Sequence, residues 1–253
     1  MLRLLLPFSK RFILLGSLST LLFILLFILS SCEEKTEETQ VDLQVRFTPG
    51  GDLFDAATVY TINGTAVQFN VLRFYMSGIY LEDVAGNPVS TDAYILAQPN
   101  DPPYLLGNVQ PQAYTALNFN VGIDAATNIL DPTQYGSANP LAPQAPNMHW
   151  DWTSGYIFLR IDGIYDGDGD GTPDSGNGFE VHLGSDNFLS TLSIPGSFGG
   201  DDSEALTLTL NYDPLELFTG IDFPTVNTTH TMDNLPMAMQ VKDNMPLAFS
   251  LTP

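Results

Sequence analysis

Residues 58–69 read TVYTI-NG-TAVQF, which is two runs of β-branched and aromatic residues joined by Asn63 and Gly64. An Asn-Gly pair tolerates the positive φ angles that a tight two-residue turn needs, so this stretch predicts a β-hairpin. Upstream, apolar residues alternate with polar ones from 41 to 47, as they do in a half-buried strand. Both patterns indicate a fold built from antiparallel strands.

Strand signals dominate the rest of the chain as well. Further predicted strands cover 71–82, 93–97, 114–121, 155–162, 178–183 and 205–212. Glycine and proline, 21 and 18 residues of 253, separate these runs, and no stretch after residue 31 keeps a helical period for more than two turns. We therefore expect residues 41–253 to form one all-β domain, an antiparallel β-sandwich or irregular barrel with long loops.

The charge of the chain excludes several classes of partner and site. It has 8 Lys and Arg against 29 Asp and Glu, a formal net charge of −21, and one cysteine. A surface this negative repels nucleic acid and anionic lipid headgroups, whereas it attracts cations. A single cysteine allows neither an intramolecular disulfide nor a cysteine-rich zinc or iron–sulfur site within one chain.

The first 31 residues have the pattern of a signal peptide. Basic residues are followed by an uncharged apolar run from Phe12 to Ser31. This run is long enough for a membrane span, but the sequence LSSC at 29–32 resembles the bacterial lipobox, in which cleavage precedes a lipid-modified cysteine. We therefore expect residues 1–31 to be removed and Cys32 to carry lipid.

Residues 32–40 are acidic and polar, which is typical of a flexible tether. Acidic residues directly behind a lipidated cysteine also resemble the surface-export signal of bacterial lipoproteins. We expect an outer-membrane lipoprotein whose N-terminal lipid holds it at the periplasmic face or at the cell surface.

Three histidines are candidates for metal binding: His149, His182 and His230. In the strand predicted around His182, Glu180 lies on the same face and the apolar residues on the other. An extended 229–233 segment would likewise place His230 and Met232 on one face. Imidazole and thioether together suit copper better than zinc or magnesium. The spacing alone leaves open a purely structural role for these histidines.

Residues 166–174 read DGDGDGTPD, in which carboxylates recur at every second position and glycines let the backbone curl. Oxygen ligands with this spacing fold around Ca²⁺ in EF-hand loops, where a glycine at position 6, here Gly171, permits the sharp turn. The residue at position 12 is Asn177 rather than a bidentate Glu. We predict a calcium site, with a solvated acidic loop as the alternative. The predicted ligands are Asp166, Asp168, Asp170 and Asp174.

Residues 148–160 read MHWDWTSGYIFLR and resemble the M-x-W-x-W-x-x-G-Y-x-x-x-(K/R) block of MbnP-like proteins. Other blocks of this family match in family order at 72–81, at 119–124 with Asn128, and at 182–184. The resemblance extends over roughly the whole predicted β domain. It implies a β-rich extracytoplasmic copper-binding protein rather than an enzyme, related to proteins of methanobactin uptake and to copper-repressed surface proteins of methane oxidisers.

Copper in these relatives is held by histidines and, in some members, by a kynurenine formed from tryptophan. The resemblance implies His182 as a copper ligand, because it lies in the matched 182–184 step. His230 and His149 are its predicted companions, with Met232 as an additional soft ligand.

The kynurenine of the relatives is attributed to a dihaem partner protein of the bacterial peroxidase type. A kynurenine in this chain would have to come from Trp150 or Trp152, its only tryptophans. The family places the oxidised tryptophan two residues before a ligand histidine, and no such pair occurs here. This departure favours a buried aromatic pair that packs at the start of the 155–162 strand.

The sequence contains no Gly-x-Ser-x-Gly, no Walker loop, no His-Glu-x-x-His and no dinucleotide-binding fingerprint. We therefore expect no enzymatic activity. Two functions remain. The first is a lipid-anchored copper-binding protein of MbnP-like type that acts in copper capture or handling. The second is a calcium-stabilised β-sandwich lipoprotein that binds a protein or glycan partner at the cell surface.

Overall fold

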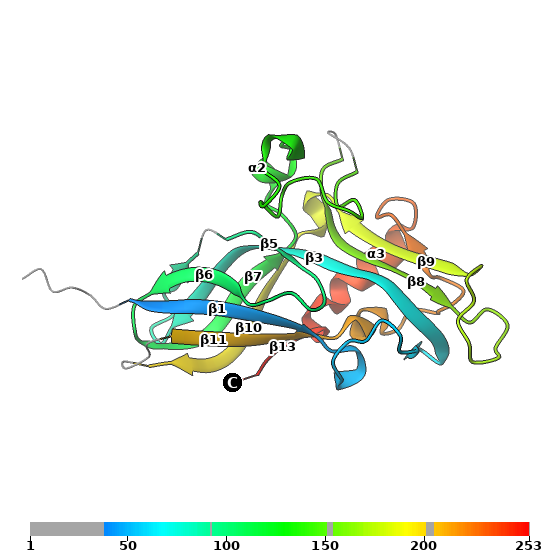
Figure 1. The fold of residues 1–253 in the computed structure, drawn as a ribbon, viewed down its shortest axis with the longest axis horizontal. Coiled ribbons are helices and arrows are strands. Elements are labelled where there is room, and N and C mark those ends of the chain that lie inside the picture. The colour runs from blue at the N-terminus through cyan, green and yellow to red at the C-terminus, as the bar shows by residue number, and fades with distance from the viewer. Residues whose placement is uncertain (1–37, 92, 151–153, 201–204, 253) are drawn as a thin grey trace, which may run out of the picture. The chain divides into compact units, whose positions relative to one another are not determined.

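The computed structural model describes residues 38–91, 93–150, 154–200 and 205–252. The predicted signal peptide, Cys32 and Trp152 lie outside these ranges. Within them the chain forms two β-sheets (Figure 1). The smaller sheet has the strand order β13-β11-β1-β6. Its strands are β1 (Thr39–Phe47), β6 (Tyr104–Val109), β11 (Ala205–Tyr212) and β13 (Phe249–Thr252).

The larger sheet follows the path β10-β7-β3-β8-β9-β12, and three short strands pair with β3 beside this path. Its strands are β2 (Tyr60–Ile62), β3 (Thr65–Asp83), β4 (Pro88–Ser90), β5 (Ile95–Ala97), β7 (Ala113–Val121), β8 (Ile157–Tyr165), β9 (Gly178–Gly184), β10 (Ser190–Gly199) and β12 (Thr228–Thr229). Both sheets are open across the described ranges. The predicted β-sandwich is confirmed, and the barrel alternative is not.

Most neighbouring strands run antiparallel, as predicted, but two pairs are parallel. β1 pairs with β11 along its length, and β12 pairs with β9 through Thr228 opposite Glu180. The alternation of apolar and polar residues predicts a strand and its buried face, but it does not predict the direction of the neighbouring strand. The second parallel pair positions the segment after β12 beside β9.

The predicted hairpin is confirmed. β2 and β3 pair around Asn63 and Gly64, whose φ angles are 48° and 93°. The side-chain amide of Asn63 donates to the carbonyl oxygens of Phe218 and Ile221, both at 2.8 Å. The turn residue therefore also ties the hairpin to a loop far away in the sequence.

Several strands differ from the predicted ones. β3 joins the predicted segments 65–69 and 71–82 into one strand of 19 residues, with a register shift against β8 between Phe69 and Val71. Such a bulge interrupts the two-residue alternation without ending the strand. β4, β6, β10, β12 and β13 have weak sequence signals because they are short or contain glycine or proline, such as Pro195 in β10.

The two sheets pack against each other through aromatic rings. The ring of Phe74 on β3 lies 4.8 Å from that of Tyr212 on β11 and 5.4 Å from that of Phe249 on β13, measured between centroids. All three side chains are buried. Aromatic pairs of this kind contribute about 0.5–1.5 kcal/mol each beyond the area they bury. They hold the smaller sheet against the β3 face.

The loops between β7 and β8 cover a second, smaller core. Tyr75, Met148 and Tyr156 are buried in it, and Trp150 packs against it while partly buried. Because successive side chains of a strand point to opposite faces, Phe74 enters the main core and its neighbour Tyr75 enters this second one. The packing fixes the segment that carries Met148 and Trp150 against the larger sheet.

Helical turns connect the strands of the described chain. They are α2 (Ala125–Asn128), α3 (Leu235–Asn244), η1 (Pro49–Gly51), η2 (Pro132–Gln134), η3 (Asp186–Phe188), η4 (Pro214–Phe218) and η5 (Met245–Leu247). In the ranges that the structure describes, no helix combines the length and the apolar character that crossing a membrane requires.

The helix α3 has ten residues, close to three turns, although the sequence shows no helical period of that length. Its Met237, Ala238 and Val241 are buried in the main core, and Figure 1 shows the helix behind β8 and β9. Leu235 and Met239 are exposed on the same helix. These two apolar residues on the solvent side obscure the helical period in the sequence.

Candidate metal centre

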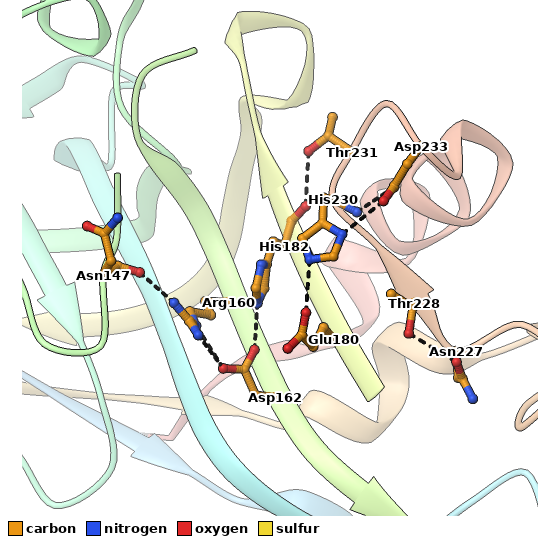
Figure 2. A network of polar contacts seen from close by, with 10 residues as sticks. All are labelled: Asn147, Arg160, Asp162, Glu180, His182, Asn227, Thr228, His230, Thr231 and Asp233. Atoms are coloured by element: carbon orange, nitrogen blue, oxygen red, sulfur yellow. Dashed lines mark hydrogen bonds and ion pairs between the residues drawn. The ribbon is translucent and has the colours of Figure 1, made fainter. Parts of the chain in front are cut away.

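The parallel pairing of β12 with β9 brings two of the three candidate histidines together. His182 lies on β9, and His230 directly follows β12. Their ring centroids are 4.8 Å apart, with an angle of 79° between the ring planes. One ligand atom each of Glu180, His182 and His230 lie within 4.8 Å of one another (Figure 2). We call these three residues the histidine site.

The alternation of β9 accounts for two members of the histidine site. Phe179 and Val181 are buried in the main core, so Glu180 and His182 lie on the other face, as predicted. Glu180 is exposed, whereas His182 is only 6% exposed. The site therefore lies at the boundary between the packed sheet and solvent.

Thr231 fixes the segment that carries His230. Its hydroxyl group donates to the carbonyl oxygen of His182 and accepts from the backbone N–H of Gly184, both at 3.0 Å. Thr231 is buried, so these two bonds have little competition from water. They hold the His230 segment to the edge of β9.

The chain turns directly after His230. Thr231 has a φ of 70°, and the N–H of Met232 donates to the carbonyl oxygen of His230 at 2.9 Å. The prediction of an extended 229–233 segment is therefore wrong, because this three-residue turn reverses the chain. The side chain of Met232 is 72% exposed and does not share a strand face with His230. Both residues line one pocket of about 600 Å³.

An ionised carboxylate holds His182. Its Nε2 lies 2.5 Å from Oδ1 of Asp162 on β8. The other oxygen of Asp162 accepts from Nε and Nη2 of Arg160 at 2.8 and 2.7 Å. Burial opposes the ionised form of Asp162, but the hydrogen bonds from His182 and Arg160 outweigh it and lower the pKa of this carboxyl group. Figure 2 shows the chain of contacts from Arg160 through Asp162 to His182.

Two carboxylates hold His230. Its Nδ1 lies 2.9 Å from Oδ2 of Asp233, and its Nε2 lies 2.9 Å from Oε2 of Glu180. Burial lowers the pKa of His230, but the hydrogen bonds to Asp233 and Glu180 outweigh it and raise the pKa above 6.5. Both ring nitrogens donate when the imidazole is protonated. A metal ion at His230 would replace one of these protons.

His149, the third predicted ligand, does not converge with other possible metal ligands among the described residues. It forms an isolated β-bridge with Tyr156 and packs edge-on against its ring at 4.7 Å. Its exposed fraction is 9%. These contacts favour a packing role for His149.

Trp150 packs directly behind the histidine site. A Cβ atom added at Gly184, two residues after His182, would lie 2.4 Å from the Trp150 ring. The indole, which is partly buried, therefore rests on the backbone of β9. The same residue also lines the pocket that His230 and Met232 share. The second predicted candidate for oxidation, Trp152, lies outside the described residues.

The acidic loop forms a second group of possible metal ligands. One carboxylate oxygen each of Asp166, Asp168 and Asp174 lie within 4.8 Å of one another. Asp170, the fourth predicted ligand, is not in this group and accepts a hydrogen bond from the N–H of Thr172 at 2.8 Å. Three of the four predicted calcium ligands therefore converge in this loop.

Backbone groups already bind the buried member of this loop. Asp166 accepts from the N–H groups of Gly171 and Gly169, both at 2.7 Å, and these bonds lower the pKa of its carboxyl group. Gly169 and Gly171 have φ angles of 82° and 89°, which the predicted sharp turn requires. The loop is therefore curled as predicted.

Sequence reasoning missed the carboxylates that hold the two histidines. Asp162 and Asp233 have no metal-ligand spacing from His182 or His230. One signal for Asp162 does exist on β8, where Arg160 and Asp162 are two residues apart and so lie on the same face of the strand. Only the register between β8 and β9, which the sequence does not provide, sets these residues beside His182.

The chain is similar to known proteins in both sequence and fold. The family model MbnP matches residues 38–233. A solved structure, that of MbnP from Methylosinus trichosporium, is similar with a TM-score of 0.57 and 17% sequence identity, over 85% of this chain and 98% of the other. No curated protein sequence matches. At this identity the structural likeness shows a common fold.

Proposed function

Because the chain belongs to the MbnP family, we propose that it is an extracytoplasmic copper-binding protein, anchored by lipid at Cys32, that captures or handles copper rather than catalysing a reaction. One observation carries the proposal. Segments 48 residues apart in the sequence place the imidazoles of His182 and His230 side by side, with Glu180 next to them.

The donor set of the histidine site fits copper. Two imidazole nitrogens and a carboxylate oxygen suit Cu better than Mg or Ca, which prefer oxygen ligands alone. The formal net charge of −21 raises the local concentration of cations of every kind. Selectivity for copper would therefore come from the imidazoles. His182 and His230 would hold the ion, and Glu180 is placed to join them.

Conversion of Trp150 to kynurenine by a dihaem peroxidase-type partner, the maturation step of the relatives, is the alternative to its packing role. The pocket that Trp150 shares with His230 makes this alternative testable. Coproduction with such a partner followed by peptide mass spectrometry tests this step. A Trp150 peptide of unchanged mass in copper-loaded protein would assign this residue a packing role alone.

Copper affinity is expected to depend on pH through His230. Neutral imidazole binds metal, and the carboxylates raise the pKa of His230 above 6.5, so protons begin to displace copper at a pH above that value. Asp233→Asn removes one of the two carboxylates and should shift the loss of affinity to lower pH. Competition with a chromogenic chelator over roughly pH 5.5–8.5 measures this shift.

The exposed Asp243 on α3 provides the control for this experiment. Asp243→Asn changes the net charge equally at a carboxylate that is not one of the two bonded to the ring of His230, and it should leave the pH profile of the parent unchanged. Identical profiles for the parent and Asp233→Asn would contradict the assignment of His230 as a ligand.

Lipid anchoring depends on the one cysteine. Cys32→Ser is expected to abolish incorporation of labelled palmitate and to leave an unprocessed or differently cleaved protein, since the thiol is the acceptor for lipid. Cell fractionation with palmitate labelling measures the change. Lipid incorporation into Cys32→Ser would show that the lipobox assignment is wrong.

Calcium binding by the acidic loop is a second candidate property, favoured by the convergence of Asp166, Asp168 and Asp174. An ion that binds only the folded chain stabilises it, which predicts a melting temperature higher by roughly 5–10 °C at a calcium concentration about one hundred times the dissociation constant. Asp168→Asn should remove most of this gain.

Asp170 provides a matched control for the calcium experiment. It has the same spacing and charge, but it lies outside the converging group, so Asp170→Asn should retain most of the calcium effect. A parent protein that melts at the same temperature with and without calcium would eliminate the site.

A further inference from the structure

Four polar residues form two facing pairs on β8 and β9. In this antiparallel pair Arg160 lies opposite His182, and Asp162 lies opposite Glu180. All four side chains are on the same face of the larger sheet, away from the main core. The contact that crosses between the strands is the diagonal one from His182 to Asp162 (Figure 2).

The bonds of Asp162 determine which ring nitrogen of His182 carries a proton. Arg160 binds Oδ2 through two nitrogens at 2.7 and 2.8 Å, which leaves Oδ1 for Nε2 of His182 at 2.5 Å. An ionised carboxylate only accepts hydrogen bonds, so Nε2 must carry the proton and donate it. In neutral imidazole the lone pair is then on Nδ1.

We propose that Asp162, fixed by Arg160, is a positioning residue that holds His182 in the Nε2–H form and so presents Nδ1 as the atom that binds metal. This inference rests on the proposed function. A ligand histidine whose second nitrogen donates to a carboxylate has a fixed orientation and a more basic ligand nitrogen. Asp162 therefore acts on the metal only through His182. It contacts Nε2 of that ring and does not itself bind the metal.

Arg160 is suited to this task because it is held from two sides. Its Nη1 donates to the carbonyl oxygen of Asn147 at 2.7 Å, while Nε and Nη2 bind Asp162. The planar guanidinium group provides all these donors at once, which the single ammonium group of lysine cannot do. The same side chain thus ties the segment leading to Trp150 to the strand that orients His182.

The first test measures the tautomer of His182 in the metal-free protein. Ring-nitrogen chemical shifts of the full-length protein in detergent, with histidine labelled by ¹⁵N, report which nitrogen carries the proton. His182→Gln identifies the signals of this residue. At a pH where His182 is neutral, we expect the proton on Nε2. A proton on Nδ1 would overturn the inference without any further variant.

The second test uses Asp162→Asn. Arg160 would hold the amide oxygen, so the amide N–H₂ group would face His182 and donate to Nε2. The proton is then expected to move to Nδ1, the nitrogen that should bind the metal. Loss of such an orienting carboxylate typically lowers metal affinity about 10- to 100-fold. Arg160→Lys, which retains the charge but not the fork, should give a smaller loss in the same direction.

Asp42→Asn is the matched control, since Asp42 is equally half-buried on a strand but belongs to the smaller sheet. It should retain the parent tautomer and copper affinity. A parent-like tautomer and affinity in Asp162→Asn, with copper binding lost in His182→Ala, would overturn the inference and leave the proposed function standing. Undiminished copper binding in His182→Ala would instead remove the proposed function, and with it the role of Asp162.

Discussion

His182→Ala and His230→Ala are each expected to lower copper affinity by about a hundredfold or more, equivalent to about 2.7 kcal/mol. Each substitution removes one of two imidazoles that converge from β9 and from the turn after β12. A carboxylate such as Glu180 is a poor replacement for an imidazole at copper. Competition titrations of Cu(I) and Cu(II), with folding checked by circular dichroism, measure the effect.

His149→Ala is the matched control for these titrations. The side chain packs against Tyr156 and lies in neither group of converging ligands among the described residues. Its affinity for copper should equal that of the parent. Equal affinity in the parent and all three variants would mean that the copper binding of the relatives does not extend to this chain.

Gly184→Ala is expected to destabilise the protein by about 3 kcal/mol and to lower the melting temperature by roughly 6–12 °C. A Cβ atom there would lie 2.4 Å from the Trp150 ring and 2.5 Å from the carbonyl oxygen of Tyr156. The ring can move, but the carbonyl oxygen belongs to the backbone that leads into β8. Thermal and urea unfolding of parent and variant measure the change.

The same substitution at an open glycine provides the control. Gly176 has no atom within 4 Å of an added Cβ, so Gly176→Ala should change stability by no more than about 0.5 kcal/mol. A Gly184→Ala protein as stable as Gly176→Ala would show that Trp150 does not rest on β9. Trp150→Ala combined with Gly184→Ala should recover part of the loss if the ring is the main obstacle.

Local patterns predict much of this fold. The Asn63-Gly64 pair specifies a turn through backbone angles alone, and the alternation in β9 specifies which face His182 occupies. The parallel pairing of β12 has no such local cause. It depends on contacts between segments far apart in the sequence, such as the bond from the hydroxyl group of Thr231 to the carbonyl oxygen of His182 at 3.0 Å.

The candidate site, like the fold, has features that the local sequence predicts and features that it does not. The type of its residues could be predicted, since imidazole is a common ligand of copper and of other transition metals. Their meeting depends on Thr231, whose hydroxyl group binds β9 and whose positive φ turns the chain. A β-branched residue with positive φ is uncommon, so a regular extended segment was the expected structure there. For this reason the sequence also misplaced Met232.

Anomalous diffraction at the copper edge from crystals of the copper-loaded protein tests the central claim most directly. We expect one strong copper peak within bonding distance of a ring nitrogen of His182 and of a ring nitrogen of His230. The nitrogen of His182 is Nδ1 if Asp162 positions the ring as proposed. A strong peak at His149 or in the 166–174 loop, with none between His182 and His230, would contradict the central claim.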